Sequence, residues 1–85
     1  MKAKYSILIT KRAKKEIDKL DLVAKKRLKK ALLNLMLNPL ALSTKLIDHK
    51  LGSRRFRVGN HRIIFDLKGN EIVILRVGHR REIYR

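Results

Sequence analysis

The chain has 85 residues and a mass of 10.0 kDa, which is enough for one small domain, 1–85, with a single core. It contains no cysteine, so disulfides, thiolate metal sites and cysteine nucleophiles are excluded. No apolar run approaches the ~18 residues that a membrane span requires, and the N-terminus lacks the apolar segment of a signal peptide. We therefore expect a folded, cytoplasmic protein.

The charge is strongly positive: 23 lysines and arginines stand against 7 acidic residues, a net charge of +16. Such a field attracts polyanions, which here means nucleic acid, an anionic membrane surface or an acidic protein. The two basic residue types are divided, because 12 of the lysines lie in residues 1–51 and 8 of the arginines in residues 52–85. Since the planar guanidinium binds phosphate oxygens bidentately, the second segment is predicted to hold a phosphate ligand and the first to attract it.

The N-terminal half of the sequence predicts one strand and two helices. Residues 5–9, YSILI, have the apolar, β-branched character of a buried strand. Thr10 is then a helix N-cap, and apolar residues recur at i, i+4 and i+7 over a helix that covers about 11–19. Asp21 can cap a second helix, which ends before Pro39. The apolar residues of the first helix are Ala13, Ile17 and Leu20, and those of the second are Ala24, Leu28, Ala31, Leu32 and Leu35.

The two helices are expected to pair as a helical hairpin, because the connection between them is short. Lysines occupy the solvent face of the second helix. Leu33, Met36 and Leu37 widen its apolar surface beyond one stripe, which indicates additional burial against a partner.

After a connector of mixed character at 40–52, the hydrophobic period changes from 3.6 to 2, which indicates strands. Three strands are expected, at 54–58, 61–67 and 71–77. Gly59-Asn60 is a two-residue hairpin signal, 68–70 is a second turn, and Gly78 is expected to break the last strand. The order of elements predicts an α+β fold, in which an N-terminal strand and a three-stranded antiparallel meander form one sheet with both helices on one face.

The strand register is predicted to gather arginines on one face of this sheet. A two-residue first turn places Arg57 opposite Arg62, and a three-residue second turn places Arg62 opposite Arg76. A two-residue second turn is the alternative, and it would reverse the faces of the last strand. The expected arginine face carries Arg55, Arg57, Arg62 and Arg76. The expected core face carries Phe56, Val58, Ile63, Phe65, Val73, Leu75 and Val77.

Arginines directly opposite each other on paired strands repel unless an anion lies between them. Asp66 is the only acidic residue expected nearby, and it can neutralise one guanidinium at most. Arg57 and Arg62 are therefore predicted to bind an anion, whereas an ordinary surface role is expected for Arg76.

The tail GHRREIYR is expected to bring His79, Arg80 and Tyr84 to the rim of the sheet. These side chains can perform acid–base and phosphate-binding work, although an ordinary loop histidine and a tyrosine that anchors the C-terminus are the alternatives. His49 and His61 are expected to be structural. Three irregularly spaced histidines without cysteine predict no metal site and no cofactor.

The run KLGSRRFRVGNHRIIFDLKGNEIVILRVGHRREIY resembles the RelE/ParE family of bacterial and archaeal toxins from toxin–antitoxin pairs. The shared elements are KL-G, R-x-R-V-G-x-x-R-I and G-H-R-x-x-I-Y, in that order. Upstream, YSILITKRAKKEIDKL and a helix that ends in N-P fit the opening of the family, so that the resemblance covers essentially the whole chain.

The resemblance implies a RelE-like fold and a ribosome-dependent endoribonuclease that cuts mRNA in the A site without a metal ion. It also implies an antitoxin partner, expected to be acidic and RelB-like, and no membrane partner. By position, the family's catalytic residues match Arg62, Arg80 and Tyr84. Arg55 and Arg57 match its basic residues on the preceding strand, and His79 and Arg81 are expected to contact the substrate with them. Some family members have lysine on that strand; arginine is a poorer proton donor, so no general acid is assigned.

The chemistry of RNA cleavage agrees with these roles. RNA can be cut without metal when its own 2′-OH attacks the adjacent phosphate. Tyr84 is the candidate base, because surrounding guanidinium groups would favour its phenolate. Arg57 and Arg62 would hold the non-bridging oxygens, and Arg80 would stabilise the leaving oxygen.

Two other functions stay open from the sequence. The ParE branch of the same fold inhibits DNA gyrase and is not a nuclease. A basic domain of this kind can also be a nucleic-acid-binding module without catalytic activity. The cluster of Tyr84, Arg62 and Arg80 favours the nuclease, because neither alternative needs such a set of groups.

Overall fold

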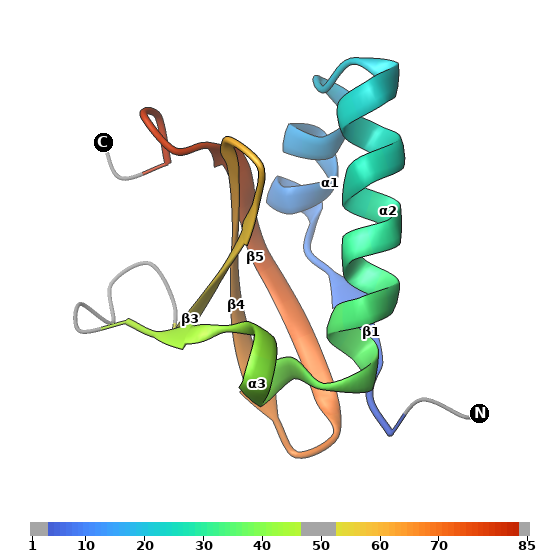
Figure 1. The fold of residues 1–85 in the computed structure, drawn as a ribbon, viewed down its shortest axis with the longest axis vertical. Coiled ribbons are helices and arrows are strands. Elements are labelled where there is room, and N and C mark those ends of the chain that lie inside the picture. The colour runs from blue at the N-terminus through green and yellow to red at the C-terminus, as the bar shows by residue number, and fades with distance from the viewer. Residues whose placement is uncertain (1–3, 47–52, 84–85) are drawn as a thin grey trace.

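The computed structural model describes residues 4–46 and 53–83, which form one mixed sheet of five strands and three helices in these ranges. The elements in chain order are β1 (Ser6–Ile9), α1 (Lys11–Asp18), α2 (Leu22–Leu37), α3 (Pro39–Leu42), β2 (Thr44–Lys45), β3 (Arg54–Val58), β4 (His61–Lys68) and β5 (Glu71–His79). The strand order is β1-β5-β4-β3-β2, and α1 and α2 cover one face of the sheet (Figure 1). The predicted α+β class is confirmed, with the difference that β1 runs parallel to β5.

The predicted caps of the two long helices are confirmed. The Thr10 hydroxyl accepts a hydrogen bond from the Ala13 N–H at 3.2 Å and donates one to the Ile74 carbonyl at 2.8 Å. The Asp21 carboxylate accepts a hydrogen bond from the Ala24 N–H at 2.7 Å. Each cap satisfies a backbone donor that the helix itself leaves free. Thr10 also ties the start of α1 to β5.

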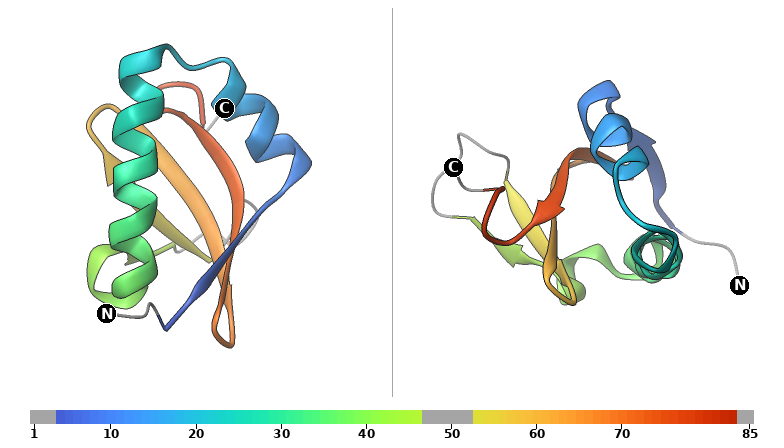
Figure 2. Two further views of the ribbon diagram at one scale, coloured as in Figure 1. Left: turned by 90° about the vertical axis from the view of Figure 1, so that its right-hand side faces the viewer. Right: turned by 90° about the horizontal axis from the view of Figure 1, so that it is seen from above.

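The two helices form the predicted hairpin on one face of the sheet, but the main contact of each helix is with the sheet and not with the other helix. α1 packs on β5, whereas α2 lies over β3, and Figure 2 shows the sheet visible between them. Both helices bury their apolar sides against the sheet instead, through Ala13 of α1 and Leu28 and Leu35 of α2. The sheet contributes Ile63, Phe65, Ile72, Ile74 and Val77 to this core. Within the described residues, no helix is long and apolar enough to cross a membrane.

Helix α3 and strand β2 lie in the segment that was expected to be a connector. The Asn38 side chain accepts a hydrogen bond from the Ala41 N–H at 3.3 Å, and Pro39 occupies the start of the new helix. An N-capping asparagine followed by proline is a helix-start signal, so the sequence itself contains the signal that predicts this helix. Arg54 holds the segment on the sheet, because its Nε donates to Ser43 Oγ at 2.6 Å and its Nη2 to the Ser43 carbonyl at 3.2 Å.

The first hairpin has the predicted register. Val58 pairs with His61 and Arg57 with Arg62 across a two-residue turn. Gly59 has a φ of 60°, whereas no described residue other than glycine has a positive φ, so the turn follows the type II′ pattern with glycine first.

The second hairpin differs from the prediction. Lys68 pairs with Glu71, so the turn has two residues and not three. As a result Ile72 and Ile74 face the core, and Val73, which was expected there, lies on the opposite face beside Asp66. A β-bulge then leaves Leu75 without a partner on β4. Because of this extra residue, the side chains that follow it alternate between the two faces as predicted.

Two further predictions about β5 are wrong. Arg76 pairs with Ile64, and the residue opposite Arg62 is Gly78. Gly78 does not break the strand, since β5 continues to His79. Val77 faces the core as predicted.

Candidate nucleic-acid interface

Three arginines lie on the face of the sheet that is turned away from α1 and α2, which is the left side in Figure 1. Arg57 of β3 is exposed and lies directly opposite Arg62 of β4. Arg55 is half-buried, and because it lies two residues before Arg57 it shares that face. We call Arg55, Arg57 and Arg62 the arginine face.

Arg62 is the buried member of this face, with 7% of its surface exposed. Its Nε has no hydrogen-bond partner among the described residues. Its Nη1 reaches the His61 carbonyl at 3.5 Å, which is the limit of a hydrogen bond. A buried guanidinium without a partner is costly, because burial removes the water that would otherwise solvate its charge. This arrangement is typical of a site that binds an anion.

Asp66, which lies on the same face of β4 as Arg62, is already engaged. Asp66 Oδ1 accepts a hydrogen bond from the Ser53 backbone N–H at 2.8 Å, which fixes the start of β3. Within the described residues, Asp66 forms no ion pair with the arginine face. No carboxylate of the described residues neutralises Arg57 or Arg62, so their positive charge is available to bind an anionic ligand.

Arg76 was predicted to lie opposite Arg62, and this prediction is wrong. Its guanidinium binds Glu16 of α1, with Nε 3.2 and 3.1 Å from Oε1 and Oε2 and Nη2 3.1 Å from Oε2. Glu16 Oε1 also accepts a hydrogen bond from the Val77 backbone N–H at 3.0 Å. Glu16 thus holds the strand just beyond the bulge. Arg76 was expected to be an ordinary surface residue, and it instead forms a largely buried ion pair with α1.

The C-terminal turn carries Arg80 and Arg81 to the edge of the arginine face. The Arg80 N–H donates to the Asn60 carbonyl at 2.9 Å, so the turn is attached to the tip of the first hairpin. The backbone then curls, and the His79 carbonyl accepts from the Ile83 N–H at 3.1 Å. Ile83 is fully buried beside Gly78, the residue opposite Arg62, whereas Arg80 and Arg81 are exposed.

The candidate base and His49 lie outside the described residues. Tyr84 immediately follows Ile83, whose position at the rim of the arginine face is described. The role of Tyr84 stays a prediction. His49 belongs to the segment 47–52, and its structural role also stays a prediction.

His79 is not brought together with Arg62. It pairs with His61 on the helix side of the sheet, and their ring centroids are 5.9 Å apart in an edge-on arrangement. Its Nδ1 accepts a hydrogen bond from the Arg81 N–H at 3.2 Å, which attaches the ring to the C-terminal turn. Within the described residues, no group of three or more histidines and carboxylates is placed to hold a metal ion.

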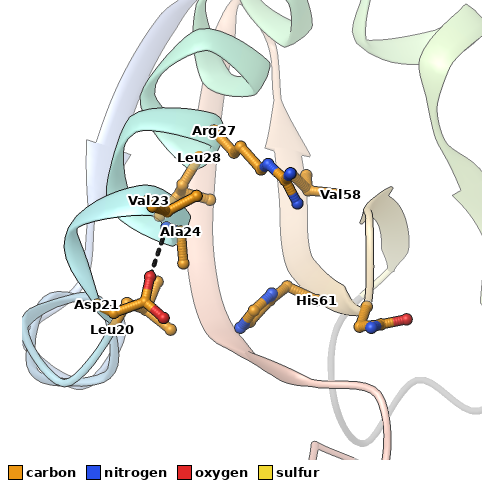
Figure 3. A pocket seen from close by; sticks show the side chains of 9 residues that line it. Leu20, Asp21, Val23, Ala24, Arg27, Leu28, Val58 and His61 are labelled. Carbon is orange, nitrogen blue, oxygen red and sulfur yellow. Dashed lines mark hydrogen bonds between the residues drawn. The ribbon is translucent and has the colours of Figure 1, made fainter.

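A hollow of about 150 Å³ lies between the start of α2 and the tip of the first hairpin. Its walls are mainly apolar, with Leu28 and Val58 on opposite sides, and Arg27 and His61 supply polar groups (Figure 3). The sequence did not predict this hollow, because its walls come from two segments at least thirty residues apart. No local signal in the sequence could have revealed it.

Comparisons with known proteins bear on the family and the fold of the chain. Residues 7–84 match the family described as ParE toxin of type II toxin-antitoxin system, parDE. The structure is similar to the toxin-antitoxin complex RelBE2 from Mycobacterium tuberculosis, with 25% identity, a TM-score of 0.82, and coverage of 89% of this chain and 98% of that one. It is also similar to the RelB-RelE antitoxin-toxin complex from Methanococcus jannaschii, with 30% identity, a TM-score of 0.73, and coverage of 91% and 94%.

YafQ from E. coli shares the fold, with 22% identity, a TM-score of 0.66, and coverage of 95% of this chain and 99% of that one. No curated protein matches the chain in the sequence comparison. The match over residues 7–84 and the agreement of fold with the RelE chains lead to one conclusion: this chain belongs to the RelE/ParE family of toxins from type II toxin–antitoxin systems.

Proposed function

We propose that this toxin is an endoribonuclease that cuts mRNA in the ribosomal A site, and that it uses the RNA's own 2′-OH as the nucleophile without a metal ion. The observation that carries the proposal is Arg62, a buried guanidinium whose Nε has no partner in the described residues and which lies opposite a second, exposed arginine. Two guanidinium groups so placed fit the non-bridging oxygens of one phosphate.

In the proposed reaction the 2′-oxygen forms a bond to phosphorus and the bond from phosphorus to the 5′-oxygen breaks. The products are a 2′,3′-cyclic phosphate and a 5′-hydroxyl. Tyr84 takes the proton of the 2′-OH, and Arg57 and Arg62 hold the phosphate oxygens as negative charge develops. Arg80, exposed at the end of the sheet beside Asn60, stabilises the leaving 5′-oxygen, which takes a proton from solvent water to become the 5′-hydroxyl.

The helix side of the sheet supports a different part of the proposal, the antitoxin. The matched RelE chains come from complexes with RelB antitoxins. In this chain Leu33, Leu37 and Leu40 are all more than half exposed, although they are large apolar residues. An acidic antitoxin with an amphipathic helix would cover these leucines and neutralise part of the +16 charge.

The test of the nuclease is the change Tyr84→Phe, assayed with mRNA in translating ribosomes. It removes one oxygen and leaves the ring, so we expect unchanged ribosome binding and a ~10²–10⁴-fold loss of cleavage. Tyr5→Phe is the matched control, because Tyr5 is the only other tyrosine and packs against the core. Normal cleavage by the Tyr84→Phe protein would refute the assignment of the base. Wild-type protein that binds ribosomes and leaves the mRNA intact would favour a binding module instead.

Gyrase inhibition is the second candidate function, because the family matched by residues 7–84 is described as a ParE toxin. The order of events after expression separates the two. A nuclease of mRNA stops protein synthesis first, whereas a gyrase inhibitor stops DNA replication first. Inhibition of DNA supercoiling by the purified toxin, without mRNA cleavage, would favour gyrase.

A further inference from the structure

The second half of β5 has a neighbouring strand on one side only. β1 pairs with residues 71–74 of β5 and ends there, whereas β4 pairs with β5 as far as His79. Beyond Ile74, in the described part of the chain, the backbone groups on the open side of β5 therefore have no strand to bond. Val77 lies in this stretch and is only 1% exposed. A buried backbone N–H needs an acceptor, which here must come from a side chain.

Two side chains at the start of the helical hairpin bond this open side of β5. The Thr10 hydroxyl and its backbone N–H both donate to the Ile74 carbonyl, at 2.8 and 3.1 Å, just before the bulge. Glu16 Oε1 accepts a hydrogen bond from the Val77 N–H at 3.0 Å, just after the bulge. Among the described residues, no other side chain bonds the backbone of residues 76–79. Glu16 thus takes the place that β1 leaves empty.

Arg76 fixes the direction of the Glu16 carboxylate. Its Nε lies 3.2 and 3.1 Å from Oε1 and Oε2, and its Nη2 lies 3.1 Å from Oε2. The two side chains are only 16% and 21% exposed, so the ion pair is partly shielded from water. Because the planar guanidinium binds both carboxylate oxygens, it holds Oε1 in place as the acceptor for Val77.

The strand that Glu16 holds leads directly into the candidate site. Val77 is followed by Gly78, by the C-terminal turn with Arg80, and then in sequence by Tyr84. Glu16 and this turn line the same hollow of about 270 Å³, so the carboxylate lies beside the segment that it would position. A displacement of β5 at Val77 would therefore be passed on to the residues that follow it.

We propose that Glu16 is a positioning residue of the proposed nuclease: by bonding the Val77 N–H it sets where Arg80 and Tyr84 lie relative to a phosphate on the arginine face. This inference rests on the proposed function. Glu16 touches neither the RNA nor the reacting atoms and acts through β5. The arginine face belongs to β3 and β4, whose pairing Glu16 does not contact. Loss of the bond should therefore lower kcat and leave KM unchanged, since a misplacement of about 1 Å can cost about 10²-fold in rate.

The test compares two double variants, Glu16→Gln/Arg76→Met and Glu16→Leu/Arg76→Met, for mRNA cleavage in translating ribosomes. Both remove the ion pair, keep the wild-type net charge and leave no guanidinium unpaired at this place. They differ in one respect, because glutamine can still accept the Val77 N–H and leucine cannot. We expect a kcat within about twofold of wild type for the glutamine variant and at least about tenfold lower for the leucine variant, with KM within about twofold in both.

Hydrogen exchange measures the position of the C-terminal turn without any cleavage. The Arg80 and Ile83 N–H groups bond the Asn60 and His79 carbonyls, and both exchange with solvent when the turn opens. We expect their exchange to be at least about fivefold faster in the leucine variant than in the glutamine variant. Thermal melts check that both variants fold. If leucine prevents folding, Glu16→Ala/Arg76→Met replaces it, because alanine also lacks an acceptor and favours the helix.

Three outcomes would overturn the proposal: an equal kcat in the two double variants, a loss confined to KM, or equal exchange of the Arg80 and Ile83 N–H groups. A wild-type chain that cuts no mRNA refutes the nuclease, and the exchange comparison then decides the role of Glu16 by itself. Failure of the positioning role and failure of the proposed function are thus told apart.

Discussion

Arg62 allows a direct test of the arginine face, because its role in binding and its effect on stability should have opposite signs. The change Arg62→Met keeps a long side chain of similar shape and removes the charge. With 7% of the residue exposed and Nε unpaired in the described part of the chain, the wild-type protein bears the cost of an unsatisfied buried donor, about 1–3 kcal/mol. Arg62→Met should therefore raise the free energy of unfolding by about 1–3 kcal/mol.

For a domain of this size each kcal/mol shifts Tm by about 4–8 °C, so the melting temperature should rise by at least about 4 °C. Binding of single-stranded RNA should fall in the same variant. Urea unfolding and thermal melts measure the stability, and fluorescence anisotropy with a labelled RNA measures the binding.

Arg76→Met is the matched control, because Arg76 is an arginine on the neighbouring strand that is also mostly shielded from solvent but has a carboxylate partner. It would lose the hydrogen bonds of 3.1–3.2 Å to Glu16, so this variant should be less stable by about 1.5–3 kcal/mol. An Arg62→Met protein that is less stable than wild type and binds RNA normally would refute the reasoning. Such a result would mean that Arg62 has a structural role and does not bind an anion.

Three other changes test parts of the fold and the site. Thr10→Val removes the cap of α1 and its bond to the Ile74 carbonyl, and should lower the free energy of unfolding in urea by about 1–2 kcal/mol. Deletion of Leu75 removes the bulge and leaves Ile74 opposite Phe65 and Arg76 opposite Ile64, so Val77 still faces the core and circular dichroism should show a folded protein; a deletion variant that unfolds would contradict the register described above. Combining Arg80→Ala with Tyr84→Phe should reduce cleavage by less than the product of the single losses, since both groups act on one transition state, and a fully multiplicative loss would show that they act independently.

The sequence alone determined the features that depend on neighbouring residues. The caps Thr10 and Asp21 and the apolar spacing that follows them fix where α1 and α2 begin. The two-residue turn at Gly59 fixes the pairing of Arg57 with Arg62, because a hairpin's register follows from its turn. Even the helix that was missed, α3, carries its own signal in Asn38-Pro39.

The tertiary structure decided the features that join distant segments. Arg76 and Glu16 are 60 residues apart, and their contact exists because α1 packs on β5 and not closely on α2. The bulge at Leu75 follows from the need to bury both Ile74 and Val77 against the helices, which strict alternation does not allow. The burial of Arg62 likewise depends on three segments, since β3 and β5 flank it and the C-terminal turn packs beside Gly78. Spacing along the chain fixes which face a residue takes within one strand, but the solvent around it depends on elements brought together only when the chain folds.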